Sequence, residues 1–451
     1  MNFKNISIVI LLGLGALAFP VSNLFLEKEV PKLENTDPKF QKIAPVLAQK
    51  CMDCHSSYTK MPFYAKLPIA SQLIGKDIEE GLEHLDIYKI FLSNDVSERD
   101  LAKLEGVTLN GSMPPFRYTA MHWDANLSDD ERADIVDWVK SIRAEKYSSL
   151  YTRNEMKGEV IQPLPRRLNV NWEKAKLGEK LFNDKRLSGD DSISCATCHG
   201  LDKGGTDRRQ YSLGINGQEG HINSPTVFNS RFNFVQFWDG RAPTLVAQAH
   251  GPVHNPIEMG SNWEEAIAKL KKDPRFVKAF KSVYGRKYSG DNMADAIAEF
   301  ERTLVTPSRF DQYLLGKADA ISAEEKKGYE LFKKHGCASC HYGVNLGGKS
   351  FEKMGETKNY FKDRGNISVE DYGRFNVTKE EHDRYRFKVP TLRNVAVSQP
   401  YLHDGSQDSL YDTVQVMAKY QFGHNISSKD ANLIVKFLET LTGYYKKEPL
   451  Q

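Results

Sequence analysis

The sequence of 451 residues has few cysteines, and none of them stands outside one short motif, Cys-x-x-Cys-His. The motif occurs three times, as Cys51, Cys54 and His55, as Cys195, Cys198 and His199, and as Cys337, Cys340 and His341. No thiol is left over for a structural disulfide. A single unit could be a redox dithiol or half of a zinc site. Three units with no surplus cysteine indicate three covalently bound c-type haems, with both thiols bonded to the haem and the adjacent histidine bound to its iron.

A strong excess of charge of either sign is also missing. The 62 lysine and arginine residues and the 59 aspartate and glutamate residues leave a formal net charge of +3. Such a balance does not call for nucleic acid or another strongly charged polymer as a partner. Strand patterns are few and short, so we expect a mainly α-helical fold.

Long apolar runs are absent except at the N-terminus. After Lys4, residues 5–26 carry no charge, and about 20 apolar residues are enough to span a bilayer. Ala16-Leu17-Ala18 could be a signal-peptidase site, but apolar sequence continues to Leu26, which favours an uncleaved anchor within residues 1–30. Bacteria attach haem covalently outside the cytoplasmic membrane. We therefore expect the protein on the periplasmic side of the inner membrane, with soluble periplasmic protein after signal cleavage as the alternative.

The rest of the chain repeats one plan, in which a haem motif is followed by a long loop and a closing helix. We expect a monohaem domain at 38–146, a linker at 147–170, a second haem domain at 171–312 and a third at 313–451. The closing helices are expected near residues 128–142, 291–305 and 427–441. Ser128 and Glu131 form a capping-box pattern at the start of the first of these. The expected architecture is three cytochrome c-like domains in tandem after the anchor.

The second axial ligand of each haem is sought between the motif and the closing helix, because electron-transfer haems of this type are often ligated by histidine and methionine. Met113, within Ser-Met-Pro-Pro, is the candidate in the first module, and the candidate in the third is Met417. Weaker candidates are Met61, Met121 and His122 in the first module and His403 and His424 in the third. In the second module the repeat points to Met259, which is adjacent to Glu258. Spacing alone leaves two options open there: Met259 as an iron ligand, or Glu258 as a carboxylate near an open iron.

From about Trp172 to Gly443 the sequence resembles the bacterial dihaem cytochrome c peroxidases, relatives of the dihaem enzymes that mature methylamine dehydrogenase. The motifs that carry this resemblance are Ser224-Pro-Thr-Val-Phe-Asn229, Gln236-Phe-Trp-Asp-Gly-Arg241, Gln248-Ala-His-Gly-Pro252, Asn255-Pro-Ile-Glu-Met259, Val389-Pro-Thr-Leu-Arg-Asn394 and Pro400-Tyr-Leu-His-Asp-Gly405. The first module resembles a haem-binding domain that is fused ahead of such peroxidases. The whole arrangement is similar to the membrane-anchored trihaem subgroup.

The resemblance implies a role for each matching residue. Hydrogen peroxide would be reduced at the haem of His199, where Glu258 would move a proton between the peroxide oxygens and Gln248 would orient the peroxide. Trp238 would conduct electrons between that haem and the one ligated by His341 and Met417. A calcium ion would be bound by the Asn223 side chain and by the carbonyls of Ser398 and Pro400. The chemistry is consistent with these roles, because one carboxylate can act as both base and acid in cleaving the O–O bond.

One position departs from the family pattern. Ile215 stands where many members have a histidine that caps the peroxidatic iron at rest, and isoleucine cannot ligate iron. We expect an open haem, with His221 as the alternative cap; His250 and His254 are expected to pack in loops. The electron donor would be membrane quinol or a small cytochrome c, and a homodimer is one option for the oligomeric state.

Two other functions remain as alternatives. The first is a multihaem electron carrier in which Met259 ligates iron and no haem is open. The second is an oxidase of a protein side chain, like the maturation enzymes. Met417 argues against this oxidase, since those relatives use tyrosine at that haem.

Overall fold

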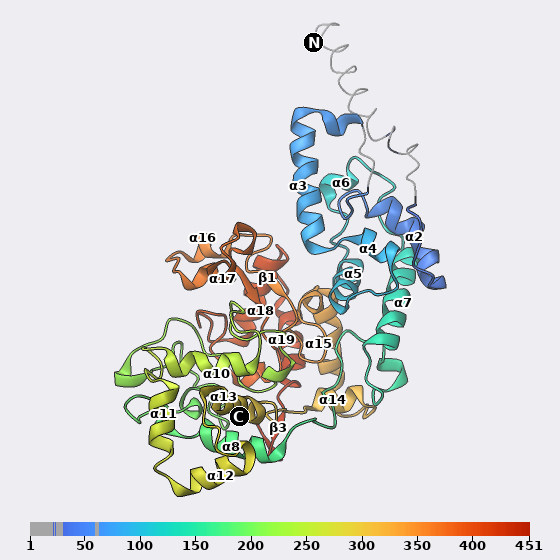
Figure 1. Ribbon diagram of the computed structural model, residues 1–451. Coiled ribbons are helices and arrows are strands. Elements are labelled where there is room, and N and C mark those ends of the chain that lie inside the picture. Colours follow the sequence, from blue (N-terminus) through green and yellow to red (C-terminus); the bar gives the residue numbers. More distant parts are fainter. Residues whose placement is uncertain (1–20, 22, 24–29, 59–62) are drawn as a thin grey trace, which may run out of the picture. The chain divides into compact units, whose positions relative to one another are not determined.

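The structure of the protein is a computed structural model that describes residues 21, 23, 30–58 and 63–451 (Figure 1). The anchor expected at residues 1–30 lies almost wholly outside the described residues, and so does Met61. None of the helices that the structure describes is both long and apolar enough to cross a membrane. Contacts divide the chain into two compact units, Met1–Ser148 and Ser149–Gln451.

The first unit is helical and is built around one apolar core. Its described α-helices are α2 (Pro38–Lys50), α3 (Pro68–His84), α4 (Ile87–Leu92), α5 (Glu98–Asn110), α6 (Phe116–Thr119) and α7 (Asp129–Lys146). Phe40 of α2 and Trp138 of α7 are fully buried, with ring centroids 5.2 Å apart. The predicted capping box is confirmed, because the backbone N–H of Glu131 donates to the Ser128 hydroxyl and that of Ser128 donates to the Glu131 carboxylate.

The second unit holds both remaining haem motifs and is also mainly helical, as expected. Its first half contains α8 (Trp172–Phe182), α9 (Cys195–Cys198), α10 (Leu245–His254), α11 (Trp263–Leu270), α12 (Pro274–Tyr284) and α13 (Gly290–Glu301). Its second half contains α14 (Arg309–Leu314), α15 (Ala323–Lys334), α16 (Tyr360–Arg364), α17 (Phe375–Thr378), α18 (Leu410–Gln421) and α19 (Ser428–Glu439). The helix expected at 291–305 ends at Glu301, several residues before the helix-breaking Pro307.

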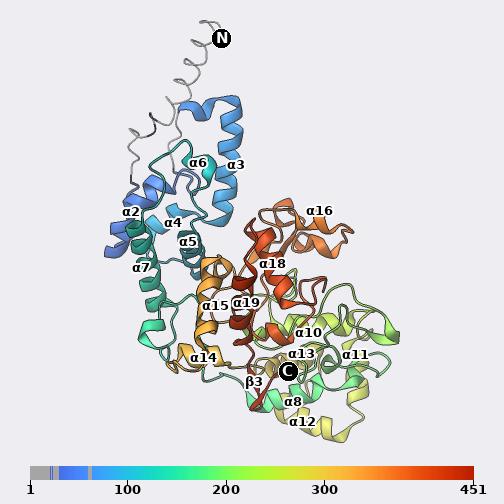
Figure 2. The same ribbon diagram turned by 180° about the vertical axis from the view of Figure 1, so that it is seen from behind.

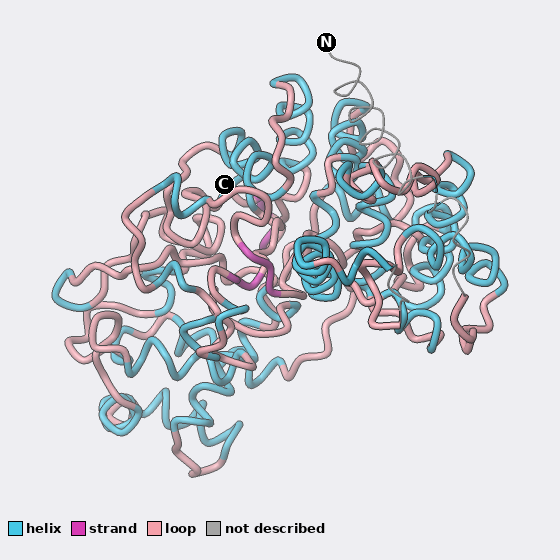
Figure 3. Tube along the Cα trace, turned by 90° about the horizontal axis from the view of Figure 1, so that it is seen from above, coloured by secondary structure: helices cyan, strands magenta, loops and turns pink. Residues whose placement is uncertain are grey.

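The described strands are few, as predicted (Figure 3). Strands β1 (Phe351–Lys353) and β2 (Arg386–Lys388) form one antiparallel pair, and β3 (Tyr444–Tyr445) and β4 (Glu448–Pro449) form another. Pairs this short do not make a sheet core, so the packing of the unit rests on its helices.

The two halves of the second unit repeat one helix pairing, visible in Figures 1 and 2 as α8 against α13 and α15 against α19. A glycine at each crossing allows the backbones to touch. A Cβ atom built on Gly178 would lie 1.8 Å from the carbonyl oxygen of Ala296, and one on Gly328 would lie 1.9 Å from that of Leu433. The repeat inferred from the haem motifs therefore extends to the helix packing.

Gly178→Ala is expected to destabilise the second unit by about 1–3 kcal/mol, because the added methyl group must push α8 away from α13. The matched control is Gly75→Ala in α3, where an added Cβ meets no heavy atom within 4 Å. That change should leave stability equal or raise it by about 0.5–1 kcal/mol, as alanine favours a helix over glycine. Thermal unfolding of both variants measures the difference. Equal effects of the two changes would contradict the close crossing.

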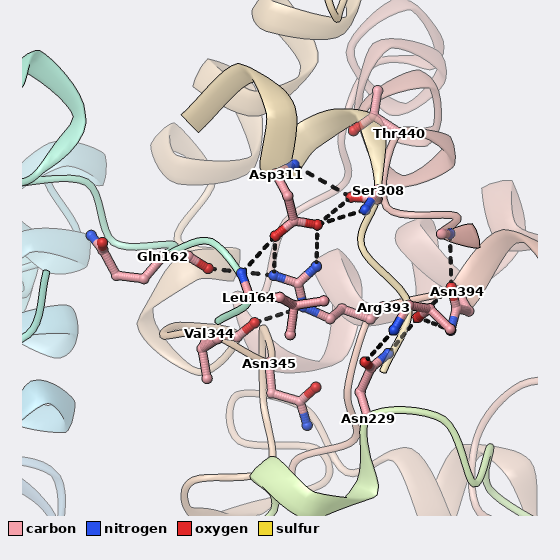
Figure 4. A network of polar contacts seen from close by, with 12 residues as sticks. Gln162, Leu164, Asn229, Ser308, Asp311, Val344, Asn345, Arg393, Asn394 and Thr440 are labelled. Atoms are coloured by element: carbon pink, nitrogen blue, oxygen red, sulfur yellow. Dashed lines mark hydrogen bonds and ion pairs between the residues drawn. The ribbon is translucent and has the colours of Figure 1, made fainter. Parts of the chain in front are cut away.

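A buried ion pair ties α14 to the loop around Arg393, later in the second half of this unit (Figure 4). The Arg393 guanidinium donates to both carboxylate oxygens of Asp311, at 2.9 and 3.0 Å, and its Nε donates to the carbonyl of Val344 at 2.6 Å. Asp311 also accepts from the backbone N–H of Leu164 at 2.8 Å. The sequence analysis treats residues 147–170 as a linker. Part of this stretch is packed into the second unit, because the backbone N–H of Leu164 binds the buried Asp311 carboxylate.

Candidate functional site

All three haem motifs present a histidine with its ring oriented by the backbone. Nδ1 of His199 donates to the carbonyl oxygen of Gly205 at 3.2 Å, and Nδ1 of His341 donates to that of Leu346 at 3.1 Å. Nδ1 of His55 lies 2.9 Å from the Gly81 carbonyl oxygen and 3.0 Å from that of Leu85. A histidine held through Nδ1 has the lone pair of Nε2 available for a metal, which is the usual arrangement of an iron ligand. The three histidines therefore fit a haem iron.

No disulfide joins any of the motif cysteines, all of which the structure describes. They are partly exposed residues, namely Cys51, Cys54, Cys195, Cys198, Cys337 and Cys340. In the first motif, a Cβ atom on Gly81 would lie 2.3 Å from the Cys54 carbonyl oxygen, so α3 packs directly against the motif. In the third, Sγ of Cys340 lies 3.8 Å from the Ser339 hydroxyl oxygen. Disulfides therefore consume none of the thiols that covalent attachment of haem requires.

The thiols of the second and third motifs fit haem attachment better than redox chemistry. Burial raises the pKa of Cys195 and of Cys337 to about 12 and that of Cys198 to about 11. A catalytic dithiol needs a lowered thiol pKa instead. Burial likewise lowers the pKa of His341 to about 4, so its ring is neutral, as a metal ligand must be.

A Pro-Thr pair occurs in one loop of the second module and in one loop of the third. In each loop the threonine hydroxyl binds the backbone of the segment that follows the haem motif. The Thr226 hydroxyl donates to the carbonyl of Gly204 at 2.7 Å, and the Thr391 hydroxyl donates to that of Asn345 at 2.7 Å. The repeated Ser-Pro-Thr and Val-Pro-Thr sequences are therefore parts of equivalent supports behind the two motifs.

Glu258 lies in the turn after α10, within reach of the second motif. Its Oε1 accepts a hydrogen bond of 2.7 Å from the Asn255 side chain. Burial raises the pKa of Glu258, while the Asn255 hydrogen bond and the charge of Arg241 oppose that rise. After burial and the charge of Asp207, the charge of Glu258 also raises the pKa of Cys198. Gln248 is on α10, in the same segment of the chain.

The position of Ile215 is fixed against this turn. Its backbone N–H donates to the Glu258 carbonyl at 2.9 Å, and its side chain is 9% exposed. A Cβ atom on Gly260 would lie 2.2 Å from the Ile215 side chain, so the two residues are in close contact. His221 is exposed. The apolar Ile215, and not a histidine, therefore packs beside Glu258.

Met259 and Glu258 have different surroundings although they are neighbours in sequence. Met259 is 3% exposed and belongs to the apolar core of the second module, with Phe182 and Trp263 among its members. His250 and His254 lie on α10, where His250 accepts a hydrogen bond of 2.7 Å from Trp263. His250 therefore has a packing role, but both histidines lie on a helix and not in the loops that the sequence analysis expects, and His254 is exposed.

Trp238 lies where loops of the two modules meet. Its indole N–H donates to the Asn223 carbonyl at 2.9 Å, and its own carbonyl accepts from the backbone N–H of Lys388 at 2.8 Å. Trp238 and Met417 both pack against one apolar cluster, which comprises Met354, Tyr360, Phe361, Phe387 and Tyr420. The structure thus brings the predicted electron conduit and the predicted ligand of the third haem to the same cluster, although they are far apart in sequence.

His403, a competing ligand candidate, is already engaged. Its Nε2 lies 2.7 Å from the Asp371 carboxylate, and the residue is 4% exposed. Arg364 bridges Asp371 and Asp404 at 2.5 and 2.6 Å, so these acids are neutralised by a cation of the chain itself. The sequence does not predict this cluster of ion pairs, because Asp371 and Arg364 belong to no recognisable motif. His424, the other competitor, is exposed.

In the first unit, Met113 lies between α5 and α6 and is 38% exposed. The rival His122 forms a hydrogen bond of 3.2 Å between its Nε2 and the Tyr64 hydroxyl and stacks on Tyr118 at 4.0 Å. That aromatic corner matches the packing role that the neighbouring residues of His122 suggest.

The expected calcium ligands also have suitable atoms. The Asn223 side chain donates through Nδ2 to the carbonyls of Arg209 and Gln210, at 3.0 and 3.3 Å, so its Oδ1 faces elsewhere. Its backbone N–H donates to the carbonyl of His403, which brings Asn223 close to the Ser398–Pro400 segment. Oε1 of Gln399 is buried there and has no hydrogen-bond partner among the described residues. Oxygen atoms are the ligands that calcium prefers, and the unpartnered oxygen of Gln399 lies between the two predicted carbonyl ligands in sequence.

Comparison with known proteins agrees with this geometry. Residues 172–319 match the family model of di-haem cytochrome c peroxidase, and residues 12–141 match that of a haem-binding domain. Cytochrome c peroxidase Ccp of Escherichia coli (strain K12) is 47% identical over 411 residues, which are 90% of this chain and 88% of that protein. Cytochrome c551 peroxidase of Pseudomonas aeruginosa is 42% identical over 63% of this chain and 84% of its own length.

A solved structure shares the fold. A MauG-like protein associated with microbial copper homeostasis superimposes with a TM-score of 0.55 at 27% identity, covering 63% of this chain and 93% of that one. The paired helices, the haem motifs and the sequence similarity lead to the same assignment. The chain belongs to the di-haem cytochrome c peroxidase family and also carries an N-terminal haem-binding domain.

Proposed function

We propose that this haem peroxidase reduces hydrogen peroxide to water with electrons that pass through three covalently bound haems. The peroxidase activity follows from membership of the family, and the count of three follows from the three equivalent motifs. The observation that carries the proposal is Glu258, a half-buried carboxyl group whose backbone carbonyl binds the N–H of Ile215, a residue that cannot ligate iron. A group in such surroundings suits proton transfer to a substrate better than ligation.

Each haem would be held by the two cysteines and the histidine of its motif. The attachment residues are Cys51 and Cys54 with His55, Cys195 and Cys198 with His199, and Cys337 and Cys340 with His341. Met113 and Met417 would be the second ligands in the first and third modules. Haem bound at His199 would supply the iron at which peroxide is reduced and part of the reducing equivalents. An open position in the second module requires that Met259, which lies in an apolar core, does not ligate this iron.

Glu258 is the proposed acid–base group. Its carboxylate takes the proton from one peroxide oxygen and gives it to the other, which leaves as water. Asn255 fixes the carboxylate by donating to Oε1, so that the other oxygen can face the substrate. The neutral amide of Gln248 orients the peroxide without binding iron strongly. Ile215 excludes water from the Glu258 side and keeps the carboxyl pKa raised.

Trp238 is proposed to carry electrons from the third module to the second. The hydrogen bonds of its indole N–H and of its carbonyl attach it to segments on both sides, at Asn223 and Lys388. A calcium ion held by Asn223, Ser398 and Pro400 would fix the same junction. Electrons would enter from membrane quinol or a small cytochrome c at the first module, on the periplasmic side of the membrane.

Replacing both cysteines of one motif by serine tests the haem count and the function together. Intact mass should fall by one haem in each of the three variants. Peroxide consumption should be abolished without the second motif, and lost or strongly slowed without the third, because Trp238 then has no reduced partner. Loss of the first motif should slow turnover with the physiological donor only. Wild-type mass with fewer than three haems, or full activity without the second motif, would contradict the proposal.

A further inference from the structure

One buried acid is not used by the proposed peroxide chemistry. Glu301 is the last residue of α13 and is 5% exposed, yet its carboxylate accepts no hydrogen bond from any residue that the structure describes. Glu299, two residues earlier, is also buried but accepts hydrogen bonds from Arg302 at 2.7 Å and from the Asn171 backbone at 2.5 Å. Burying a carboxyl group without partners is costly, so its retention needs a reason.

The internal repeat shows that packing does not require an acid at this position. Ala296 faces Gly178 as Leu433 faces Gly328. Further along, the carbonyl of Leu304 accepts from the Asn229 backbone at 2.8 Å, and that of Leu441 accepts from the Asn394 backbone at 3.1 Å. Both comparisons align α13 with α19 in the same register. That register pairs Glu301 with Leu438, which is 3% exposed.

Glu301 lies beside the second haem motif. Its neighbours Phe300 and Leu304 belong to the apolar core against which Cys195 packs. In agreement with this placement, burial and then the charge of Glu301 raise the pKa of Cys195. Burial raises the pKa of Glu301 itself to about 8, against the opposing charge of Arg302. Two basic residues on the helices packed against α13 pair with other acids of α13. Lys174 of α8 pairs with Asp295 at 2.6 Å, and His250 of α10 pairs with Asp291 at 3.3 Å. Lys269 of α11 pairs with Asp191 at 2.7 Å.

We propose that Glu301 is a redox-linked proton-binding group of the second haem module. It takes up one proton from solvent when the haem attached at Cys195 and Cys198 accepts an electron, and it releases that proton when the haem loses the electron. One O–H bond of the carboxyl group forms or breaks per electron, and the electron comes from the donor of the peroxidase reaction. The inference rests on the proposed function, because it requires a haem attached at Cys195 and Cys198.

The physical reason is charge compensation. In surroundings of low polarity, the addition of an electron nearby stabilises the protonated carboxyl group, and its removal stabilises the carboxylate. The third module has Leu438 at the equivalent place and has no such compensation from this position. The exchange therefore distinguishes the haem at which peroxide is reduced from the haem that only transfers electrons.

The test is redox-difference infrared spectroscopy of the holoprotein with a parallel titration of the haem potentials against pH. Wild-type protein should show a carboxyl C=O stretching band that appears on reduction, and the potential of the second-module haem should fall as pH rises. Glu301→Gln should lose both the band and this pH dependence. Glu301→Leu, which installs the residue of the sister module, should do the same without a polar group in the core. The exposed Glu264→Gln is the control and should retain both signals.

A band and a pH dependence that persist unchanged in both Glu301 variants would overturn the inference. Intact mass and the optical spectrum separate this failure from that of the proposed function. If wild-type protein carries no haem on Cys195 and Cys198, both proposals fail together. If the haem is attached and peroxide is reduced but neither signal depends on Glu301, only the present inference is wrong.

Discussion

Glu258→Gln is expected to lower the rate of peroxide reduction by about 10²- to 10⁴-fold, the range that a positioned acid–base group contributes. The glutamine can still accept the hydrogen bond from Asn255, so the turn should keep its shape. It cannot accept the proton of peroxide. Haem content, haem spectra and stability should therefore match those of the wild type, and the loss should appear in the rate of the chemical step. Peroxide consumption at saturating reduced donor measures it.

The pH dependence of the same variant supplies a second criterion. The carboxylate is the form that accepts the peroxide proton, so the wild-type rate should fall on acidification. Because burial raises the pKa of Glu258, this fall should begin at a higher pH than for an exposed glutamate. Glu258→Gln should lack this acidic limb. The exposed Glu264→Gln is the matched control, with wild-type rate and pH profile. A fall of less than tenfold in Glu258→Gln would remove Glu258 from the acid–base role.

Arg393→Met is expected to destabilise the second unit by about 3–5 kcal/mol, because it leaves the Asp311 carboxylate buried without its counter-charge. The guanidinium is fully buried and the Asp311 side chain is 3% exposed, so water cannot replace the lost bonds. Arg393 also donates to the Val344 carbonyl, which lies in the third module. Thermal unfolding of the full chain measures the change. Lys436→Met, which breaks the exposed pair with Glu324, is the control and should cost no more than about 1 kcal/mol.

The ion pair also predicts how stability changes with pH. Burial alone would raise the pKa of Asp311, but the charge and hydrogen bonds of Arg393 lower it below its ordinary value. A lowered native pKa contributes stability that is present above the unfolded pKa and is lost as pH falls through the native value. Arg393→Met should remove this acid-sensitive contribution. Adding Asp311→Leu to Arg393→Met should recover part of the loss, and purely additive losses would mean that the two groups are not coupled.

The elements that sequence predicts well are those with local signals. The helix at Ser428–Glu439 and the capping box at Ser128 follow from periodicity and from side chains a few residues apart. The three motifs fix the histidines and the thiols in the same way. Local signals do not reach contacts between distant residues, such as Asp311 with Arg393 or His403 with Asp371, because each partner alone is an ordinary charged residue. They also do not reveal that residues near Leu164 are buried, since that segment has no helical or strand period.

In the candidate site, too, local signals predict some features, and contacts between distant residues decide the others. The choice between Met259 and Glu258 cannot be made from spacing, because the two residues are adjacent. It depends on which side chain faces the haem iron, and the packing of elements far away in sequence decides that. The resemblance supplied the roles of Gln248 and Trp238, which by residue type alone would be a surface amide and a core aromatic.

The central claim, that one iron is open and works with Glu258, is tested most directly by rapid mixing of the fully reduced protein with stoichiometric hydrogen peroxide. The account predicts fast oxidation of the haems with two electrons consumed per peroxide, and slow oxidation in Glu258→Gln. If wild type and variant both react sluggishly while all three haems are attached and reducible, every iron is capped. The protein would then be an electron carrier with the peroxidase fold.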